Sequence, residues 1–189
     1  MFFLVFFILF SFSATSSDPV IVNCRPTPQV NVSIPKVTNS TNNLIRKTGD
    51  AVKAKGDVIY ITGRITDINC IPIQGASVFI WHKNSEGYYA INGRRIESDP
   101  LFIGSGYTVT DNLGNYNFVT IMPGSKDGNA PEINFDIQHP NFVPITTKMF
   151  FEGTNYSSDT DDVLIARKRS TETIRYNFNI ALSGESKFK

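Results

Sequence analysis

The stretch that decides the fold is residues 75–124, GASVFIWHKNSEGYYAINGRRIESDPLFIGSGYTVTDNLGNYNFVTIMPG. Its apolar run at 78–81 predicts one strand, and the alternating residues at 107–110 predict a second. Asp, Asn and Gly at 111–114 are turn residues. Residues 115–121 alternate aromatic or apolar side chains with polar ones, which is typical of a strand with one buried face. The stretch therefore predicts two strand pairs with turns between them.

Outside this stretch, short alternating segments continue in both directions. No long amphipathic helix, repeat or heptad pattern accompanies them. We therefore predict an all-β chain, an antiparallel β-sandwich of the prealbumin type with about seven strands. A short helix is expected within 159–168. The expected strands are 58–66, 76–82, 107–110, 115–121, 132–137, 143–151 and 174–182.

The chain divides into three parts by composition. Residues 1–13 are almost wholly apolar, and small residues follow at 13–17. A bilayer-spanning helix needs about 20 residues, so residues 1–16 predict a secretory signal peptide and an exported (periplasmic or secreted) protein. An uncleaved N-terminal membrane anchor is the alternative. Residues 17–56 form a polar arm that we expect to pack loosely, and 57–189 form the sandwich.

The charge balance bears on the binding partners, and the two cysteines bear on a disulfide. The 18 basic and 17 acidic residues balance, so we expect no nucleic-acid partner, and no membrane partner once the signal is cleaved. In an oxidising compartment, Cys24 and Cys70 can form a disulfide. Two free thiols are the alternative, and two cysteines alone do not make a zinc site.

A series of short motifs, in a fixed order, spans most of residues 43–182. In this order and spacing, the sequence resembles the intradiol ring-cleavage dioxygenases, such as the protocatechuate and catechol enzymes. The scaffold motifs also occur in non-catalytic sandwiches, so they do not establish an activity. The motifs are GRITD at 63–67, PIQGA at 72–76, WHKNSEGYY at 81–89, DPLFIGSG at 99–106, TDNLGNYNF at 110–118, TIMPG at 120–124, INF at 133–135 and TTKMFFEG at 146–153.

The resemblance implies an iron centre. In that family two tyrosinates and two histidines hold Fe(III), and dioxygen is inserted into the ring of a catechol, a small aromatic substrate. Tyr89 matches the first tyrosine. The second tyrosine position is Lys126, and the two histidine positions are Glu132 and Asn134. One of four ligands is therefore matched, and we expect Fe(III) to bind weakly or not at all.

Other family positions also differ. Asn129 stands at the position of an arginine, and Lys148 at that of a glutamine. His82 and His139 are the two histidines of the chain, and we expect a strand end and a turn for them rather than metal sites.

Two functions follow. The first is an exported intradiol dioxygenase-family enzyme with altered metal ligation. The second is a non-catalytic sandwich that binds a small ligand or a protein. The sequence leaves the oligomeric state open.

Overall fold

The computed structural model describes residues 24–35, 39–47, 49–89, 99–126, 128–170 and 173–184. The segment interpreted as a signal peptide, residues 1–16, lies outside the described residues. Within the described part, no helix has the length and apolar character needed to cross a membrane.

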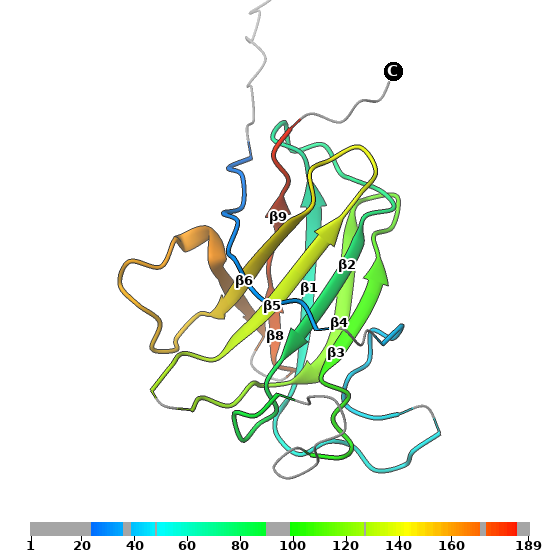
Figure 1. The fold of residues 1–189 in the computed structure, drawn as a ribbon, viewed down its shortest axis with the longest axis vertical. Coiled ribbons are helices and arrows are strands. Elements are labelled where there is room, and N and C mark those ends of the chain that lie inside the picture. Colours follow the sequence, from blue (N-terminus) through cyan, green and yellow to red (C-terminus); the bar gives the residue numbers. More distant parts are fainter. Residues whose placement is uncertain are drawn as a thin grey trace, which may run out of the picture.

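The described chain is built almost entirely of strands, arranged in two layers (Figure 1). Pairing follows the order β3-β2-β5-β6-β7-β8-β1-β4, and β9 pairs with β1. The first four strands make one layer, and the others make the second. The strands are β1 (Val58–Thr66), β2 (Ser77–His82), β3 (Ser105–Val109), β4 (Asn115–Ile121), β5 (Glu132–Gln138), β6 (Ile145–Phe151), β7 (Ile165–Ser170), β8 (Arg175–Asn177) and β9 (Ile180–Ala181).

The expectation of a purely antiparallel sandwich with about seven strands is wrong in two respects. The described residues form nine strands, and three of the pairings, β1–β8, β1–β9 and β6–β7, are parallel. One expected strand, 174–182, is split into β8 and β9. Both pieces run parallel to β1 because the chain crosses between the layers before reaching them. The all-β class itself is confirmed.

The segment 159–168 contains both helix and strand. A single 3₁₀ turn spans Asp162–Leu164, with the Asp161 carboxylate accepting a hydrogen bond from the backbone N–H of Val163. Strand β7 follows at once and was not predicted. Its residues Arg167, Lys168 and Arg169 are exposed, so the sequence lacks the apolar alternation that marks a half-buried strand.

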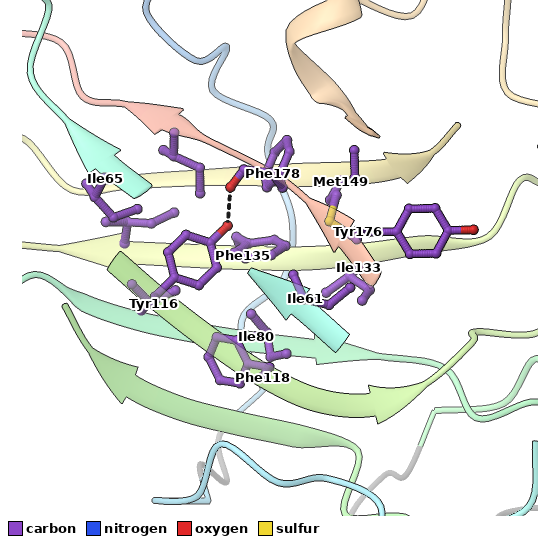
Figure 2. Close-up of a cluster of buried hydrophobic side chains, with 14 of the residues drawn as sticks. Ile61, Ile65, Ile80, Tyr116, Phe118, Ile133, Phe135, Met149, Tyr176 and Phe178 are labelled. Carbon is purple, nitrogen blue, oxygen red and sulfur yellow. Dashed lines mark hydrogen bonds between the residues drawn. The ribbon is translucent and has the colours of Figure 1, made fainter. Parts of the chain in front are cut away.

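Between the layers lies a core of aliphatic and aromatic side chains (Figure 2). On β5, Ile133, Phe135 and Ile137 all point into it and are fully buried, as the alternation predicted. Phe135 contacts rings of the other layer, with centroids 6.1 Å from Tyr116 and 5.2 Å from Phe178. The Tyr116 hydroxyl donates to the carbonyl of Phe178, which satisfies its polar atom inside the core.

Residues 41–44 of the arm lie between β3 and β4, the two ends of the sheet path. The backbone N–H of Tyr107 donates to Thr41, and that of Val119 donates to Asn42, each at 2.8 Å. Leu44 is fully buried in the core, and a Cβ at Gly106 would collide with it. The loosely packed arm expected from the sequence is therefore wrong for this segment, which closes one side of the sandwich.

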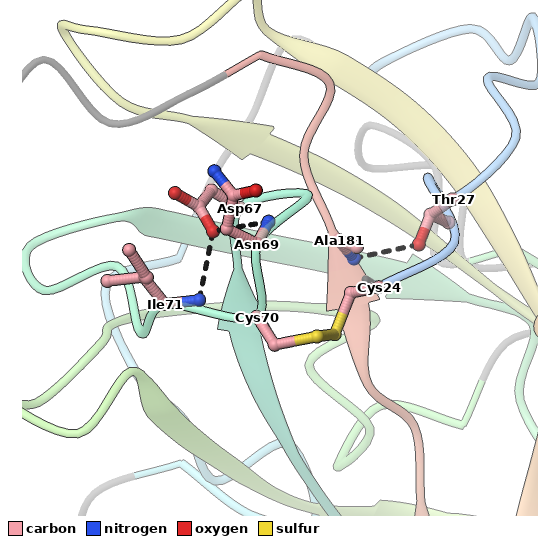
Figure 3. Close-up of a disulfide and its surroundings, with 7 residues drawn as sticks. All are labelled: Cys24, Thr27, Asp67, Asn69, Cys70, Ile71 and Ala181. Carbon is pink, nitrogen blue, oxygen red and sulfur yellow. Dashed lines mark hydrogen bonds between the residues drawn. A yellow bond between two sulfur atoms is a disulfide. The ribbon is translucent and has the colours of Figure 1, made fainter. Parts of the chain in front are cut away.

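Further along the arm towards its N-terminus, Cys24 and Cys70 form a disulfide, which ties the arm to the β1–β2 connection (Figure 3). Nearby, the N–H of Thr27 donates to the carbonyl of Ala181, and the Thr27 hydroxyl accepts from the N–H of Ala181. Val30 donates to Thr146 on β6. The arm is thus fixed at both ends of its path across the β3-β2-β5-β6 layer.

His82 connects the layers through hydrogen bonds. Its Nδ1 lies 2.7 Å from the carbonyl of Lys83, so Nδ1 must carry the proton, and Nε2 accepts from the Thr120 hydroxyl at 2.7 Å. Burial of the ring lowers the pKa of His82 from 6.5 to about 4, and the bond to Lys83 offsets part of this shift. His82 is therefore a buried neutral histidine of the core.

We expect Leu44→Ala to lower the free energy of unfolding by about 2–5 kcal/mol, because it opens a cavity where the arm closes the sandwich. Urea denaturation measures this change. Val52→Ala is the matched control at an exposed position and should change stability by less than about 0.5 kcal/mol. Equal effects of the two substitutions would show that the arm does not belong to the folded frame.

Acid should destabilise the fold through His82. Between pH 6.5 and 4 the unfolded chain binds a proton at this site and the native chain does not. The contribution of neutral His82 to the free energy of unfolding is therefore complete above pH 6.5. It falls by up to about 3 kcal/mol as the pH drops towards 4. Denaturation at several pH values should show a shallower pH dependence for His82→Gln. The carboxylates titrate in both proteins, so their effect cancels when the wild type and His82→Gln are compared. An identical pH dependence of the unfolding free energy in the two proteins would contradict the lowered pKa of His82.

Candidate functional site

The loop that follows β2 is organised by a buried asparagine. The Oδ1 of Asn84 accepts from the backbone N–H groups of Glu86 and Tyr88, at 3.1 and 2.9 Å. The N–H of Gly124 donates to the carbonyl of Asn84 at 2.8 Å. Gly87 and Gly124 lie so close that a Cβ on either would meet backbone of the other segment. This contact fixes the loop against the Pro-Gly corner after β4.

Tyr89 and Asn134, both predicted as site residues, are in contact. Tyr89 follows the Asn84 turn and pairs with Lys83 in an isolated bridge. Asn134 lies on β5, with its side chain on the outer face of the layer, and is 2% exposed. Its Nδ2 donates to the Tyr89 hydroxyl oxygen and to the carbonyl of Trp81, each at 3.2 Å. The amide thus holds the phenol oxygen without a metal.

Glu132 forms an ion pair with Lys148 of the neighbouring strand. The Lys148 ammonium lies 2.9 Å from both carboxylate oxygens. The two side chains are 25% and 20% exposed, for Lys148 and Glu132 respectively, so the pair is reached by solvent but partly shielded. Asn134 is the direct cross-strand partner of Lys148, which places Glu132 diagonally from it. The pair has no net charge.

Two further ammonium groups lie near the tyrosines. Lys126 Nζ is 4.0 Å from the ring centroid of Tyr88, and Lys83 Nζ is 5.7 Å from that of Tyr89. Both distances are within the range of cation–π contacts. The loop and the corner therefore each place a lysine ammonium against a tyrosine ring.

The remaining candidates lie elsewhere. Asn129 is exposed, and its carbonyl accepts from the Ser125 hydroxyl within the β4–β5 connection. His82 is in the core, and His139 lies in the β5–β6 connection, at the opposite end of β5 from Glu132. Their strand-end and turn positions agree with the sequence prediction.

Sequence reasoning missed two functional features. Lys148 was noted as a changed family position, but its pairing with Glu132 was not foreseen. The short connection at 139–144 predicts a hairpin of β5 and β6. The register of that hairpin places Lys148 close to Glu132. Asn84 was not singled out at all, because the sequence gives no sign that one side chain organises the whole loop.

These residues do not fit ferric iron. A trivalent cation needs several anionic or imidazole donors, and at this site Tyr89 is the one phenol that matches the family's set. Both histidines of the chain lie elsewhere, and lysines stand at two of the positions that the resemblance assigns to the site, Lys126 and Lys148. An ammonium group cannot donate a lone pair to a metal, so neither lysine replaces a lost ligand. Across the described ranges, no group of three His, Cys, Asp or Glu side chains converges to hold a metal.

The sequence profile of a family described as "Dioxygenase" matches residues 32–184. A Rickettsia typhi protein named "Putative dioxygenase" is 33% identical over 163 residues, covering 79% of this chain and 77% of that protein. The protocatechuate 3,4-dioxygenase beta chain of Burkholderia cepacia is 33% identical over 108 residues, covering 52% of this chain and 46% of that one.

Solved structures agree in fold. The dioxygenase domain of a carbohydrate-binding fusion from Streptomyces sp. SirexAA-E superposes with a TM-score of 0.70 at 22% identity, over 85% of this chain and all of that domain. An intradiol ring-cleavage dioxygenase from Tetranychus urticae gives 0.67 at 20% identity, over 85% and 95% of the two chains. With the family profile and the sequence relatives, these matches show that the chain belongs to the intradiol ring-cleavage dioxygenase family.

Proposed function

We propose that this protein is an exported member of the intradiol dioxygenase family that binds a catechol-type aromatic compound but does not cleave its ring with ferric iron. The observation that carries the proposal is the ion pair between Glu132 and Lys148, at 2.9 Å to both carboxylate oxygens. It stands where the resemblance places a histidine ligand and a neighbouring glutamine.

The pair removes the electrostatic basis for an iron site. A carboxylate that binds an ammonium through both oxygens has its charge largely neutralised, although each oxygen keeps a further acceptor site. Releasing Glu132 for a metal would leave Lys148 partly buried beside a trivalent cation, which Coulomb repulsion disfavours. Asn134, in the second histidine position, already directs both amide hydrogens to protein acceptors.

The same groups are suited to bind a diol directly. A catechol carries two adjacent hydroxyls, and each can donate and accept a hydrogen bond. Glu132 supplies an acceptor and Lys148 a donor on adjoining strands, and both side chains are reached by solvent. Tyr89, bonded to Asn134 opposite Lys148, adds aromatic surface at the site, which favours a flat ligand.

Export has two supports. The apolar residues 1–13 with small residues after them are typical of a secretory signal. The Cys24–Cys70 disulfide needs an oxidising compartment in which to form and persist.

The test of the proposed function combines iron analysis, calorimetry with catechol and an oxygen electrode, all on the purified protein. We expect catechol binding without stoichiometric iron and without oxygen uptake. Lys148→Met should weaken binding about tenfold or more, through loss of a charge-assisted hydrogen bond. Glu152→Gln is the control, because it breaks an exposed ion pair with Arg167 on β7 and leaves Glu132 and Lys148 unchanged.

The opposing results are equally distinct. Stoichiometric Fe(III), a tyrosinate-to-iron absorption band and oxygen uptake with catechol would assign the ring-cleavage activity named for the relatives. Absence of catechol binding in an iron-free, folded protein would also overturn the proposal.

A reconstruction tests whether the frame still fits the metal. We expect a variant combining Lys126→Tyr, Glu132→His, Asn134→His and Lys148→Gln to bind Fe(III) and develop the visible tyrosinate-to-iron band. The wild type and a variant with Lys148→Gln alone should stay colourless, since they lack the ligands. A colourless, folded fourfold variant would show that the corner before β5 has changed along with the side chains.

A further inference from the structure

The two ends of the sandwich differ in the strands that reach them. Strands β1, β3, β5 and β9 run towards one end, and β2, β4 and β6 start from it (Figure 1). We name it the apolar end. It consists of the connections 67–76, 110–114, 138–144 and 182–184 and the last residue of β3, Val109.

The apolar end carries most of the exposed large hydrophobic side chains of the described residues. Six such residues are exposed, and four belong to this end: Ile71 (49%), Val109 (47%), Leu113 (54%) and Val143 (69%). The turn with Leu113 also adjoins the connection with Ile71, because a Cβ at Gly114 would meet Pro72. Exposed apolar side chains gathered at one end indicate an interaction surface.

Charge is almost absent from the same connections. Asp67 and Asp111 are their only Asp, Glu, Lys or Arg residues. Asp67 Oδ1 accepts from the N–H groups of Asn69 and Ile71, both at 2.9 Å (Figure 3). Asp111 Oδ1 accepts from the N–H groups of the Leu113 turn in the same way. Both carboxylates therefore serve their own turns.

The opposite end is highly charged and carries the candidate site. Its segments 45–57, 83–89, 99–104 and 122–126 include Lys, Arg, Asp and Glu throughout: Arg46, Lys47, Asp50, Lys53, Lys55, Asp57, Lys83, Glu86, Asp99 and Lys126. Tyr89 and Glu132 lie at this end as well. The molecule is therefore polarised along the strands, with the candidate site at one end and the apolar surface at the other.

The N-terminal segment joins the molecule at the apolar end. Cys24 is held there by its disulfide to Cys70 (Figure 3). Residues 14–23 separate it from residues 1–13, and ten extended residues span at most about 36 Å. If residues 1–13 occupy a bilayer, the apolar end cannot lie far from the bilayer surface.

We propose that residues 1–13 remain in the membrane after export and that the apolar end rests on the lipid surface, with Ile71, Leu113 and Val143 at the interface. This inference rests on the export included in the proposed function. The connections of the apolar end contain no Lys or Arg, and Arg64 of β1 lies beside Asp111 and Asn115. The surface therefore fits the apolar and zwitterionic part of a bilayer, and neither anionic lipid nor low salt is needed. The candidate site then faces away from the membrane.

The test uses the full chain in phosphatidylcholine vesicles, with amide hydrogen exchange followed by mass spectrometry. We expect Leu113→Asp to speed exchange several-fold in 67–76 and 138–144, two connections that the substitution leaves unaltered. Val52→Asp is the matched control, because Val52 is 64% exposed at the opposite end and should change nothing there. High salt should leave the protection intact.

Three results would overturn the inference. The first is equal exchange in the wild type and Leu113→Asp, with both folded. The second is an exported protein whose mass lacks residues 1–16 and which is released from membranes. The third is protection that appears without vesicles and grows with protein concentration, because it would assign the surface to a second copy. Catechol binding is measured at the opposite end, so it reports on the proposed function separately.

Discussion

The period-two alternation of β5 is the constraint on which the rest of the structure depends. Ile133, Phe135 and Ile137 must enter the core between the layers, where each is fully buried. Because neighbouring side chains point to opposite faces, this requirement places Glu132 and Asn134 together on the outer face. The core therefore fixes the site geometry, whatever residues occupy the two outward positions.

This separation explains how the site changed while the frame was kept. The outward positions can be replaced without disturbing the core, provided that their polar atoms find partners. Here Glu132 is paired with Lys148, and Asn134 bonds Tyr89 and Trp81. The polar atoms of these side chains are thus paired within the protein. Two of the positions that the resemblance assigns to iron ligands, Glu132 and Asn134, are engaged in an ion pair and in hydrogen bonds.

The arm gives the molecule its remaining organisation. It begins at the disulfide on the apolar end, crosses the β3-β2-β5-β6 layer, and closes the sandwich with Leu44. A chain segment with little strand pattern of its own thereby joins edges that the strands leave open. Because Cys24 is fixed by the disulfide, the preceding chain joins the sandwich at the end opposite to Tyr89 and Glu132.

The sequence alone determined the all-β class, the buried face of β5, and the family, because period-two alternation and ordered turn motifs are local signals. Through the resemblance it also predicted Tyr89 as a matched ligand position and Lys126, Glu132 and Asn134 as replaced ones. The parallel pairings, the exposed strand β7, the role of Leu44 and the Glu132–Lys148 pair were decided by the tertiary structure. Each of them joins segments far apart in the chain or on separate strands, and no local pattern encodes which distant partner a side chain will meet.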